Sequence, residues 1–308
     1  MQITLTLINR NIKLFFRDKG LFFTSLITPV ILLVLYIAFL GGVYRDSFVS
    51  AMPIIADLPE TILEGLVGAQ LVSSLISVSC ITVSFCSNFL MVQDKANGTL
   101  KDLRITPTSQ RRLCFCYYLA SLISSLMVIF FALALCFIYL ALIGWYMSFA
   151  DVLLTVFDAA LLVLFGTALS SVINHFLSSQ GQISAVGSIV SSCYGFICGA
   201  YLPLSQFGEG LRGALSFFPG IYGTSLLRNH TMGGVLRAMS EEGISADAIE
   251  ILRDSVDCNV YFFGDKVAEP VMYLVLLGSV LMFLGIYVAM TLPRGKGKRA
   301  VKLGSSSK

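Results

Sequence analysis

Long apolar runs occupy most of the chain and alternate with shorter polar segments. A helix of about 20 apolar residues is long enough to cross the hydrocarbon core of a bilayer, and six runs reach that length. They predict membrane-spanning helices at Leu21–Val43, Gly65–Val92, Leu113–Ile143, Asp151–Asn174, Gly181–Leu202 and Val271–Leu292. We therefore predict an all-α polytopic membrane protein, with a six-span transmembrane domain over residues 20–292.

The residues before the first span have a different pattern. Helical spacing places Ile8 and Ile12 on one face of a helix, and Arg10 and Lys13 on the others. An apolar face opposite basic residues is typical of a helix that lies in the membrane interface. The pattern predicts an interfacial amphipathic helix over residues 1–19.

The segment 93–112 separates the second and third apolar runs with roughly twenty mostly polar and basic residues, whereas a connection between two spans needs only a few. It has an apolar pattern of its own at Leu100, Leu103 and Ile105, followed by Pro107. The pattern predicts one or two turns of amphipathic helix that end at the proline. Charge and periodicity alone leave two interpretations open, a docking surface for another protein and an ordinary solvated loop.

The longest polar region follows the fifth span, at residues 203–269. Its first part, through Arg228, is half apolar and rich in glycine and proline, so we expect short broken helices at the outer leaflet. Its second part, Met239–Lys266, is acidic with a helical pattern, which predicts a small external cap. We also expect an acidic loop at Arg45–Glu64 and a basic tail at 293–308.

Composition and charge narrow the class of protein. With 56% hydrophobic and 13% charged residues, and a mean hydropathy of +0.83, the chain is not a soluble globular domain. The formal net charge of +3 is too small to indicate a nucleic-acid partner. Most lysines and arginines lie in the segments 1–19, 93–112 and 293–308. The positive-inside rule therefore predicts that both termini and the central segment lie in the cytoplasm. We expect a multi-pass protein of the plasma membrane.

No catalytic or cofactor-binding motif is present in the sequence. The two histidines, His175 and His230, fall on opposite sides of the membrane in this topology, so they are not expected to share a metal. The segment Gly295–Lys298 lacks the glycine spacing and the following Ser or Thr of a phosphate-binding loop. Of the eight cysteines only Cys258 lies in a polar loop, so no disulfide framework is indicated. Uphill transport would therefore draw its energy from a partner or an ion gradient.

Two polar residues inside the predicted spans are candidates for a transport path. Asp158 lies about two turns inside the fourth span, where an unpaired carboxylate is costly and a functional role is the default hypothesis. The simpler interpretation is that Asp158 is hydrated near the interface or satisfied by a neighbouring hydroxyl group. Asn88 lies near the inner end of the second span, which is rich in Ser and Thr residues of the kind that hydrogen-bond between packed helices.

The order of these features resembles a known family. Between the second and third of six spans, the chain looks like the permease subunits of type 2 ATP-binding-cassette exporters at Asp94, Gly98-Thr99-Leu100, Leu103 and Pro107. After the fifth span it is similar to the same family at Pro203-Leu204, Pro219, Tyr222 and Arg228. The amphipathic helix before the first span adds to the resemblance, which covers nearly the whole chain.

The resemblance implies a half-transporter, in which two permeases, identical or paralogous, pair and each docks on a separate ATPase subunit through a coupling helix. The residues expected to contact the ATPase are Asp94, Gly98, Thr99, Leu100, Leu103, Arg104, Thr106 and Pro107. Those expected to form an outer gate are Pro203, Pro219, Tyr222 and Arg228. ATP and Mg²⁺ would be bound by the ATPase rather than by this chain. Lys101 departs from the family pattern, which often has an acidic residue there.

Two other classes of protein would show different patterns. A gradient-driven secondary transporter or channel would carry charge along several spans or contain a repeated half, whereas only Asp158 lies well inside a predicted span. An integral membrane enzyme would need His, Asp or Glu residues that converge at one depth. The apolar, hydroxyl-rich spans indicate an amphipathic, peptide, drug or lipid-like cargo rather than a small ion.

Overall fold

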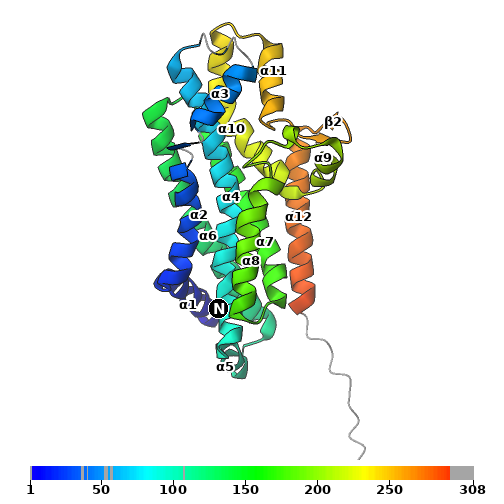
Figure 1. Cartoon of the computed structure of the whole chain (residues 1–308). Helices are drawn as coiled ribbons and strands as arrows, with labels where there is room; N and C mark the ends of the chain where they lie inside the picture. Colours follow the sequence, from blue (N-terminus) through cyan, green and yellow to red (C-terminus); the bar gives the residue numbers. More distant parts are fainter. Residues whose placement is uncertain are drawn as a thin grey trace, which may run out of the picture.

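The computed structural model describes residues 2–35, 38, 39, 41–51, 55, 58–106 and 108–291. Pro107 and the basic tail at 293–308 lie outside these residues. The described chain is almost wholly helical (Figure 1). In chain order its elements are α1 (Gln2–Arg17), α2 (Lys19–Leu35), α3 (Gly41–Ala51), α4 (Glu60–Ala96), α5 (Thr99–Ile105), α6 (Gln110–Ile143), α7 (Phe149–Phe176), α8 (Gln180–Ile197), η3 (Leu204–Gln206), α9 (Glu209–Leu215), α10 (Pro219–Glu241), α11 (Ala246–Ser255), β1 (Tyr261–Phe262), β2 (Asp265–Lys266) and α12 (Glu269–Thr291).

Helix α4 is the element around which the others pack. Helices α2, α6, α7, α8 and α10 all lie against it, and every residue of its most apolar 18-residue stretch is buried. Small residues permit this close packing. At Gly166 of α7, an added Cβ would lie 2.8 Å from Ile81 and 3.0 Å from Ser84 of α4. Such contacts between small residues are how helices associate within a bilayer, where no hydrophobic effect drives them together.

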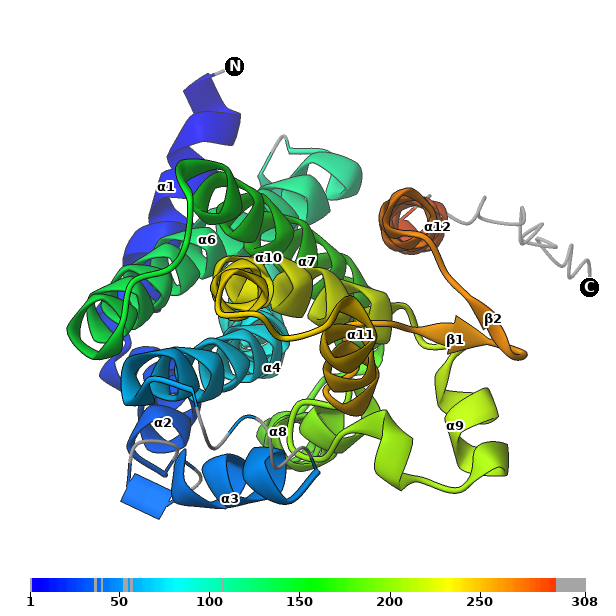
Figure 2. The ribbon, with the colours of Figure 1, turned by 90° about the horizontal axis from the view of Figure 1, so that it is seen from above.

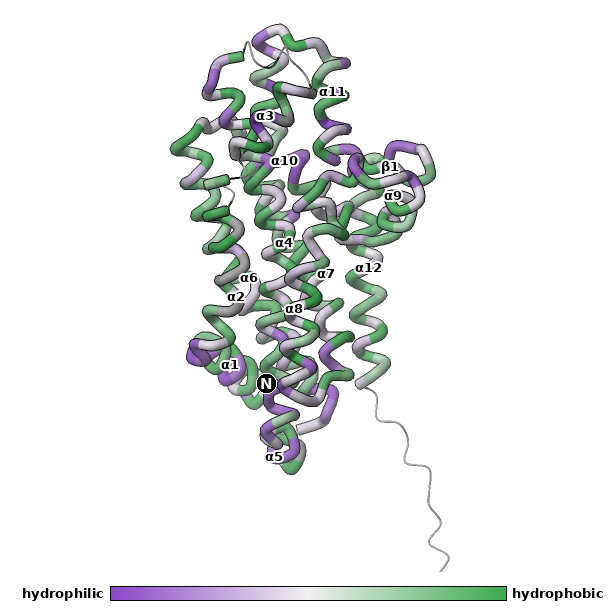
Figure 3. Tube along the Cα trace, viewed as in Figure 1, coloured by the Kyte–Doolittle hydropathy of each residue, from purple (hydrophilic) through white to green (hydrophobic). Residues whose placement is uncertain are grey.

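Four of the described helices, α4, α6, α7 and α12, are long and apolar enough to cross a membrane. Figure 3 shows the corresponding apolar band along the middle of the bundle, with hydrophilic residues gathered towards its ends. The helices at the first and fifth predicted spans are not among these four. Helix α2 has 17 residues, and α8 has 18 residues with glutamines in its first turn. The all-α polytopic fold is confirmed, and the count of six spans stays a prediction.

The N-terminal helix lies across the end of the bundle. Figure 2, which is drawn along the bundle, shows α1 from the side. Its buried face carries Ile8, Asn11 and Phe15, and Ile8 packs with Cys116 and Ala120 of α6. The amphipathic pattern in the first residues of the sequence therefore corresponds to a real helix whose apolar face is partly used for contact with α6.

The boundaries of several elements differ from the sequence prediction. The expectation of a loop at Arg45–Glu64 is wrong in part, because α3 runs through Ala51 and α4 begins at Glu60. Helix α4 also continues beyond Val92 to Ala96, since no residue there disfavours a helix. Helix α4 therefore contains an apolar span and continues into polar sequence at both ends.

The region after the fifth predicted span is only partly broken. Short helices η3 and α9 are present as expected, but Pro219–Glu241 forms one continuous helix, α10. Its glycines permit close packing rather than interrupting the helix. A Cβ added to Gly223 would clash with Leu162 of α7, and one added to Gly234 would clash with the backbone of Tyr146. We call the elements η3, α9, α11, β1 and β2, with their connections, the cap; they lie together at the end of the bundle opposite α5 (Figure 1).

Candidate coupling site and outer polar network

A single glycine turns the chain from α4 into α5. Gly98 has a φ of +83°, which glycine adopts without the strain that a Cβ would cause. The Lys101 N–H donates to the Gly98 carbonyl at 2.8 Å, so α5 starts immediately after the turn. Figure 1 shows α5 projecting beyond the ends of the long helices. Gly98 and Thr99 therefore lie where a separate short helix begins.

Asp94, in the last turn of α4, joins three helices. Its side chain is buried and accepts hydrogen bonds from the Tyr117 hydroxyl of α6 at 2.5 Å and from Arg10 Nη1 of α1 at 3.0 Å. Burial lowers the pKa of Arg10, but the hydrogen bond and charge of Asp94 outweigh burial and raise this pKa above its ordinary value. Arg10 therefore stays a cation, and Asp94 holds α1 and α6 to the base of α5.

Lys95 makes the matching contact on the other side of α4. Its Nζ donates to the carbonyls of Asn174 at 3.3 Å, His175 at 2.6 Å and Leu177 at 3.2 Å. These carbonyls lie at the C-terminal end of α7, where the helix leaves acceptors unsatisfied and its dipole favours a cation. Adjacent residues on α4 thus bind the base of α5 to four elements, α1, α6, α7 and the turn before α8.

The apolar residues of α5 face in two directions. Leu100 is buried, and it packs with Leu90 and Met91 of α4 and with Leu113 of α6; Leu103 is partly buried against the same cluster. Leu100 is therefore covered by its own chain in this structure, and its contact with the ATPase stays a prediction. Ile105 is 84% exposed and is the apolar side chain that α5 presents.

The remaining residues predicted for this surface lie at the end of α5. Thr106 is exposed, and its hydroxyl donates to the Leu103 carbonyl at 2.6 Å, which closes the last turn. The backbone of Arg104 belongs to α5, while its side chain, like Pro107, lies outside what the structure describes.

Asn88 lies within the bundle at the meeting of α4, α6 and α7. Its Nδ2 donates to the hydroxyls of Ser170 at 3.0 Å and Ser171 at 2.7 Å, and its Oδ1 accepts from Ser121 at 3.4 Å. Three hydrogen bonds satisfy most of the amide's capacity. The geometry therefore gives Asn88 a helix-packing contact.

Asp158 is satisfied by partners from two other helices. Its Oδ1 accepts from the Tyr273 hydroxyl of α12 at 2.6 Å, and its Oδ2 lies 2.5 Å from His230 Nδ1 of α10. The hydroxyl partner was among the alternatives that the sequence left open. The histidine was not anticipated, because 72 residues separate it from Asp158 along the chain. Beside this group, a cleft of about 400 Å³ is lined by charged residues that include Asp151, Arg237 and Glu269.

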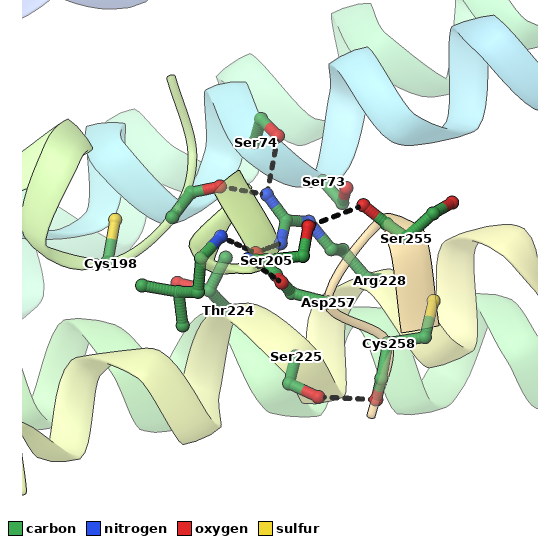
Figure 4. A network of polar contacts seen from close by, with 12 residues as sticks. Ser73, Ser74, Cys198, Ser205, Thr224, Ser225, Arg228, Ser255, Asp257 and Cys258 are labelled. Carbon is green, nitrogen blue, oxygen red and sulfur yellow. Dashed lines mark hydrogen bonds and ion pairs between the residues drawn. The ribbon is translucent and has the colours of Figure 1, made fainter. Parts of the chain in front are cut away.

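Arg228, predicted for the outer gate, is the centre of a buried network between α4, α10 and the cap (Figure 4). Its guanidinium donates to Asp257 Oδ2 at 3.3 Å, to the Ser74 hydroxyl at 3.3 Å and to the carbonyl of Gly199. Asp257 also accepts from the backbone N–H of Leu204 at 2.6 Å. Burial raises the pKa of Asp257, and the Arg228 charge with its hydrogen bonds opposes that rise.

The other residues predicted for the outer gate lie beside this network. Pro203 immediately precedes η3, and Pro219 is the first residue of α10, where proline fits the start of a helix. The Tyr222 hydroxyl donates to the Ser216 carbonyl at 2.8 Å, which ties α10 to the end of α9. Tyr222 packs with Leu204, the residue after Pro203, and Tyr222 and Arg228 are buried at this junction. Pro219 begins the helix that carries both of them.

Sequence reasoning missed the partners that complete both sites. Asp257 lies in a polar loop with no spacing relation to Arg228, and Lys95 is one basic residue among several near α5. Only the position of Lys95 directly after Asp94 was a usable signal. Among the described residues, no group of three or more His, Cys, Asp or Glu side chains could hold a metal ion.

An all-α membrane bundle with a short helix attached at one end has the form of a membrane-embedded transport subunit. The model of the ABC-2 type transporter family matches residues 2–231, and the chain therefore belongs to this family. Membership makes the chain an ABC transporter permease and implies a membrane setting and an ABC ATPase partner. A search of curated proteins finds no match.

Proposed function

We propose that the chain is the permease subunit of an ATP-driven exporter in the plasma membrane, with both termini and α5 in the cytoplasm. A separate ATPase binds ATP and Mg²⁺, and a second permease, identical or paralogous, completes the path. The cargo is amphipathic, such as a peptide, a drug or a lipid-like molecule. The basic residues beside α5 and in the segment 293–308 support this orientation.

The observation that carries the proposal is the way α5 is held. Asp94 and Lys95 fasten its base to four elements, and Leu100 fixes its inner face. Ile105, the last residue of α5, stays exposed, and α5 itself projects from the bundle (Figure 1). A rigid helix with one exposed apolar side chain is suited to a pocket on a partner, where such anchors supply most of the binding energy. A push on α5 would reach α1 and α6 through Asp94, and the α7–α8 turn through Lys95.

The exposed face of α8 supports a second permease. Ile189 is 61% and Phe196 51% exposed on this helix, whose other face packs against α4. Pairing through α8 would place the α4 helices of two permeases close to a shared path. Transport would then require the Arg228 junction, including Pro203, Pro219 and Tyr222, to loosen as the outer gate opens.

Co-purification of the full chain with its ATPase tests this function. We expect Ile105→Asp to abolish the association, because a charge would enter an apolar contact, whereas Ile105→Val should retain it. Leu100→Asp should act differently, because it introduces a charge beneath α5 and should lower the yield of folded permease. An ATPase that still binds Ile105→Asp fully, or that never accompanies the wild-type chain even after cross-linking, would contradict the proposal.

One observation favours a second candidate, a gradient-driven transporter. Asp158, His230 and Tyr273 form a titratable group beside a cleft, as a proton-coupled carrier would need. Vesicles containing the permease alone, given a pH gradient and no ATP, distinguish the two. Substrate movement that is lost in Asp158→Asn would support this candidate. Substrate movement that occurs only when the ATPase and ATP are present would exclude it.

A further inference from the structure

A second, larger cleft lies in the cap, between α9, α11 and the hairpin of β1 and β2. It measures about 1040 Å³ and has two kinds of wall. Phe217, Phe263 and Ile251 form an apolar wall, and each is more than half exposed. Arg212, Glu209 and Asp254 supply charges of both signs. A cleft with one apolar wall and one charged wall suits a molecule with an apolar chain and a polar head.

The hairpin tip holds an aromatic residue in an unfavourable backbone conformation. Phe263 and Gly264 form the two-residue turn between Tyr261–Phe262 and Asp265–Lys266, with φ of +50° and +95°. Two-residue hairpin turns with positive φ favour Asn, Asp or Gly, and a bulky side chain is strained there. Phe263 is nevertheless 78% exposed, so burial in the folded chain does not explain the residue. The Phe263 ring meets Phe217 and Phe262 edge to face, and the rest of the ring is open to a ligand.

The apolar wall continues the lipid-facing surface of α12. Figures 1 and 2 both place the hairpin directly before the start of α12, and Leu215 of α9 shares a hydrophobic cluster with Met272 of α12. Leu274 of α12 is 71% exposed, as expected of a side chain that faces acyl chains. Phe217 and Phe263, whose ring centroids are 5.9 Å apart, therefore lie at the boundary where that membrane surface ends.

The charges in the cleft fit a zwitterionic head better than a simple ion. Arg212 lies over the Tyr261 ring at 5.3 Å and provides a cation for a phosphate. Asp254 accepts from Asn259 and Tyr261 through Oδ1 alone, so among the described residues its Oδ2 has no hydrogen bond. With Glu209 nearby, the cleft offers carboxylate oxygens for an ammonium group.

We propose that this cleft binds a zwitterionic phospholipid from the leaflet on the cap side. The phosphate lies at Arg212, the ammonium group lies at Glu209 and Asp254, and an acyl chain passes over Phe217 and Phe263 towards α12. The floor of the cleft connects to the Arg228 network. The Ser205 hydroxyl donates to the Ser255 carbonyl at 3.3 Å, and the Ser205 N–H donates to Asp257 at 3.3 Å. A bound lipid would therefore stabilise the junction between the cap and the bundle.

Tryptophan quenching in nanodiscs tests the proposal with the full chain. The only native tryptophan is removed by Trp145→Phe, and Phe263→Trp then places a reporter at the hairpin tip. We expect phosphatidylcholine with brominated chains, present as a minor lipid, to quench this reporter more than brominated phosphatidylglycerol does. Glu209→Gln should weaken the preference by about tenfold, since it removes one charge-assisted hydrogen bond to the ammonium group, which phosphatidylglycerol lacks. Arg212→Gln should weaken quenching by both lipids, because both carry a phosphate.

Leu281→Trp, on the exposed face of α12, is the matched control, because bulk lipid of either kind should quench it equally. Three outcomes would overturn the proposal. The tip reporter escapes quenching while the α12 reporter is quenched, both lipids quench the tip equally, or Glu209→Gln leaves the preference unchanged. Phe217→Trp provides a second reporter in the same wall if Phe263→Trp does not fold.

Discussion

At the scale of residues, buried charged side chains hold distant parts of this molecule together. An arginine side chain does not lose its proton in proteins, so a buried guanidinium needs acceptors around it. Arg228 finds them in Asp257, Ser74 and the Gly199 carbonyl, and Asp94 is satisfied in the same way by Arg10 and Tyr117. Each of these groups joins elements that are distant in the sequence, so its removal leaves a buried partner unpaired.

Arg228→Met should strongly destabilise the protein. Removing one member of a buried ion pair leaves Asp257 uncompensated and costs about 3–5 kcal/mol. Thermal unfolding in detergent, followed by loss of the monodisperse peak, measures the effect. The double variant Arg228→Met with Asp257→Leu should recover much of the loss, because no buried charge remains. A single variant as stable as wild type would show that the network contributes little.

The stability of Arg228→Met should also depend on pH. Burial raises the pKa of Asp257, and the substitution removes the charge that opposes this rise. A group whose pKa is raised in the folded state stabilises below its unfolded pKa of about 3.9. Its contribution is lost as the pH rises through the folded pKa. The melting temperature of the variant should therefore fall as the pH rises above about 4, relative to the double variant. Parallel pH profiles for the two variants would contradict this assignment.

At the scale of elements, the end of α4 works as a junction. Asp94 and Lys95 are neighbours in the sequence, yet one contacts α1 and α6 and the other contacts the end of α7. This arrangement requires α4 to extend to Ala96, beyond its apolar sequence. Helix α5 is thereby held by the bundle on both sides of its base.

Lys95→Gln should separate ATP hydrolysis from transport. The amide has no charge and is too short to satisfy all three carbonyls at the α7–α8 turn. We expect the ATPase to remain bound and active in proteoliposomes, while transport per ATP falls several-fold. Lys101→Gln is the control, because Lys101 is exposed on α5 and should behave as wild type. Equal transport by the two variants would remove Lys95 from the coupling route.

At the scale of the whole molecule, we assign one part of the exposed surface to lipid and the exposed face of α8 to the proposed second permease. Of the cysteines, Cys193 on α8 is the exposed one, whereas Cys80, Cys86 and Cys136 are buried in the bundle. This residue therefore reports on the face that we assign to the second permease.

Maleimide labelling with a membrane-permeant reagent should show this pairing. Cys193 should be modified readily in dispersed permease and several-fold more slowly in the assembled transporter. The variant Cys193→Ser should lose the signal, while Cys136→Ser should keep it. Equal labelling of Cys193 before and after assembly would place the second permease on a different face.

The sequence predicted the class and much of the helical pattern, because apolar runs and amphipathic faces are local properties. It also located α5, since Gly98 and the leucines after it are neighbours in the chain. It did not predict that Leu100 faces inward and Ile105 outward, because Leu100 is buried by residues of α4 and α6 that only the folded structure brings to it. The pairs Arg228–Asp257 and Asp158–His230 form only when distant helices pack, so no local pattern indicates them.

The burial of α4 has a consequence for biosynthesis. Its serines and Asn88 find their partners on α6, α7 and α10, all of which are made after α4. When α4 first enters the bilayer, Ser84 and Ser87 already donate to carbonyls of α4 itself. The amide of Asn88 has no partner yet and faces lipid or the insertion machinery, where an unpaired polar group is unfavourable. The helix reaches its final environment only when α10 has been synthesised. Assembly of this bundle is thus a late event, and an unfinished chain leaves polar groups of α4 without the helices that cover them.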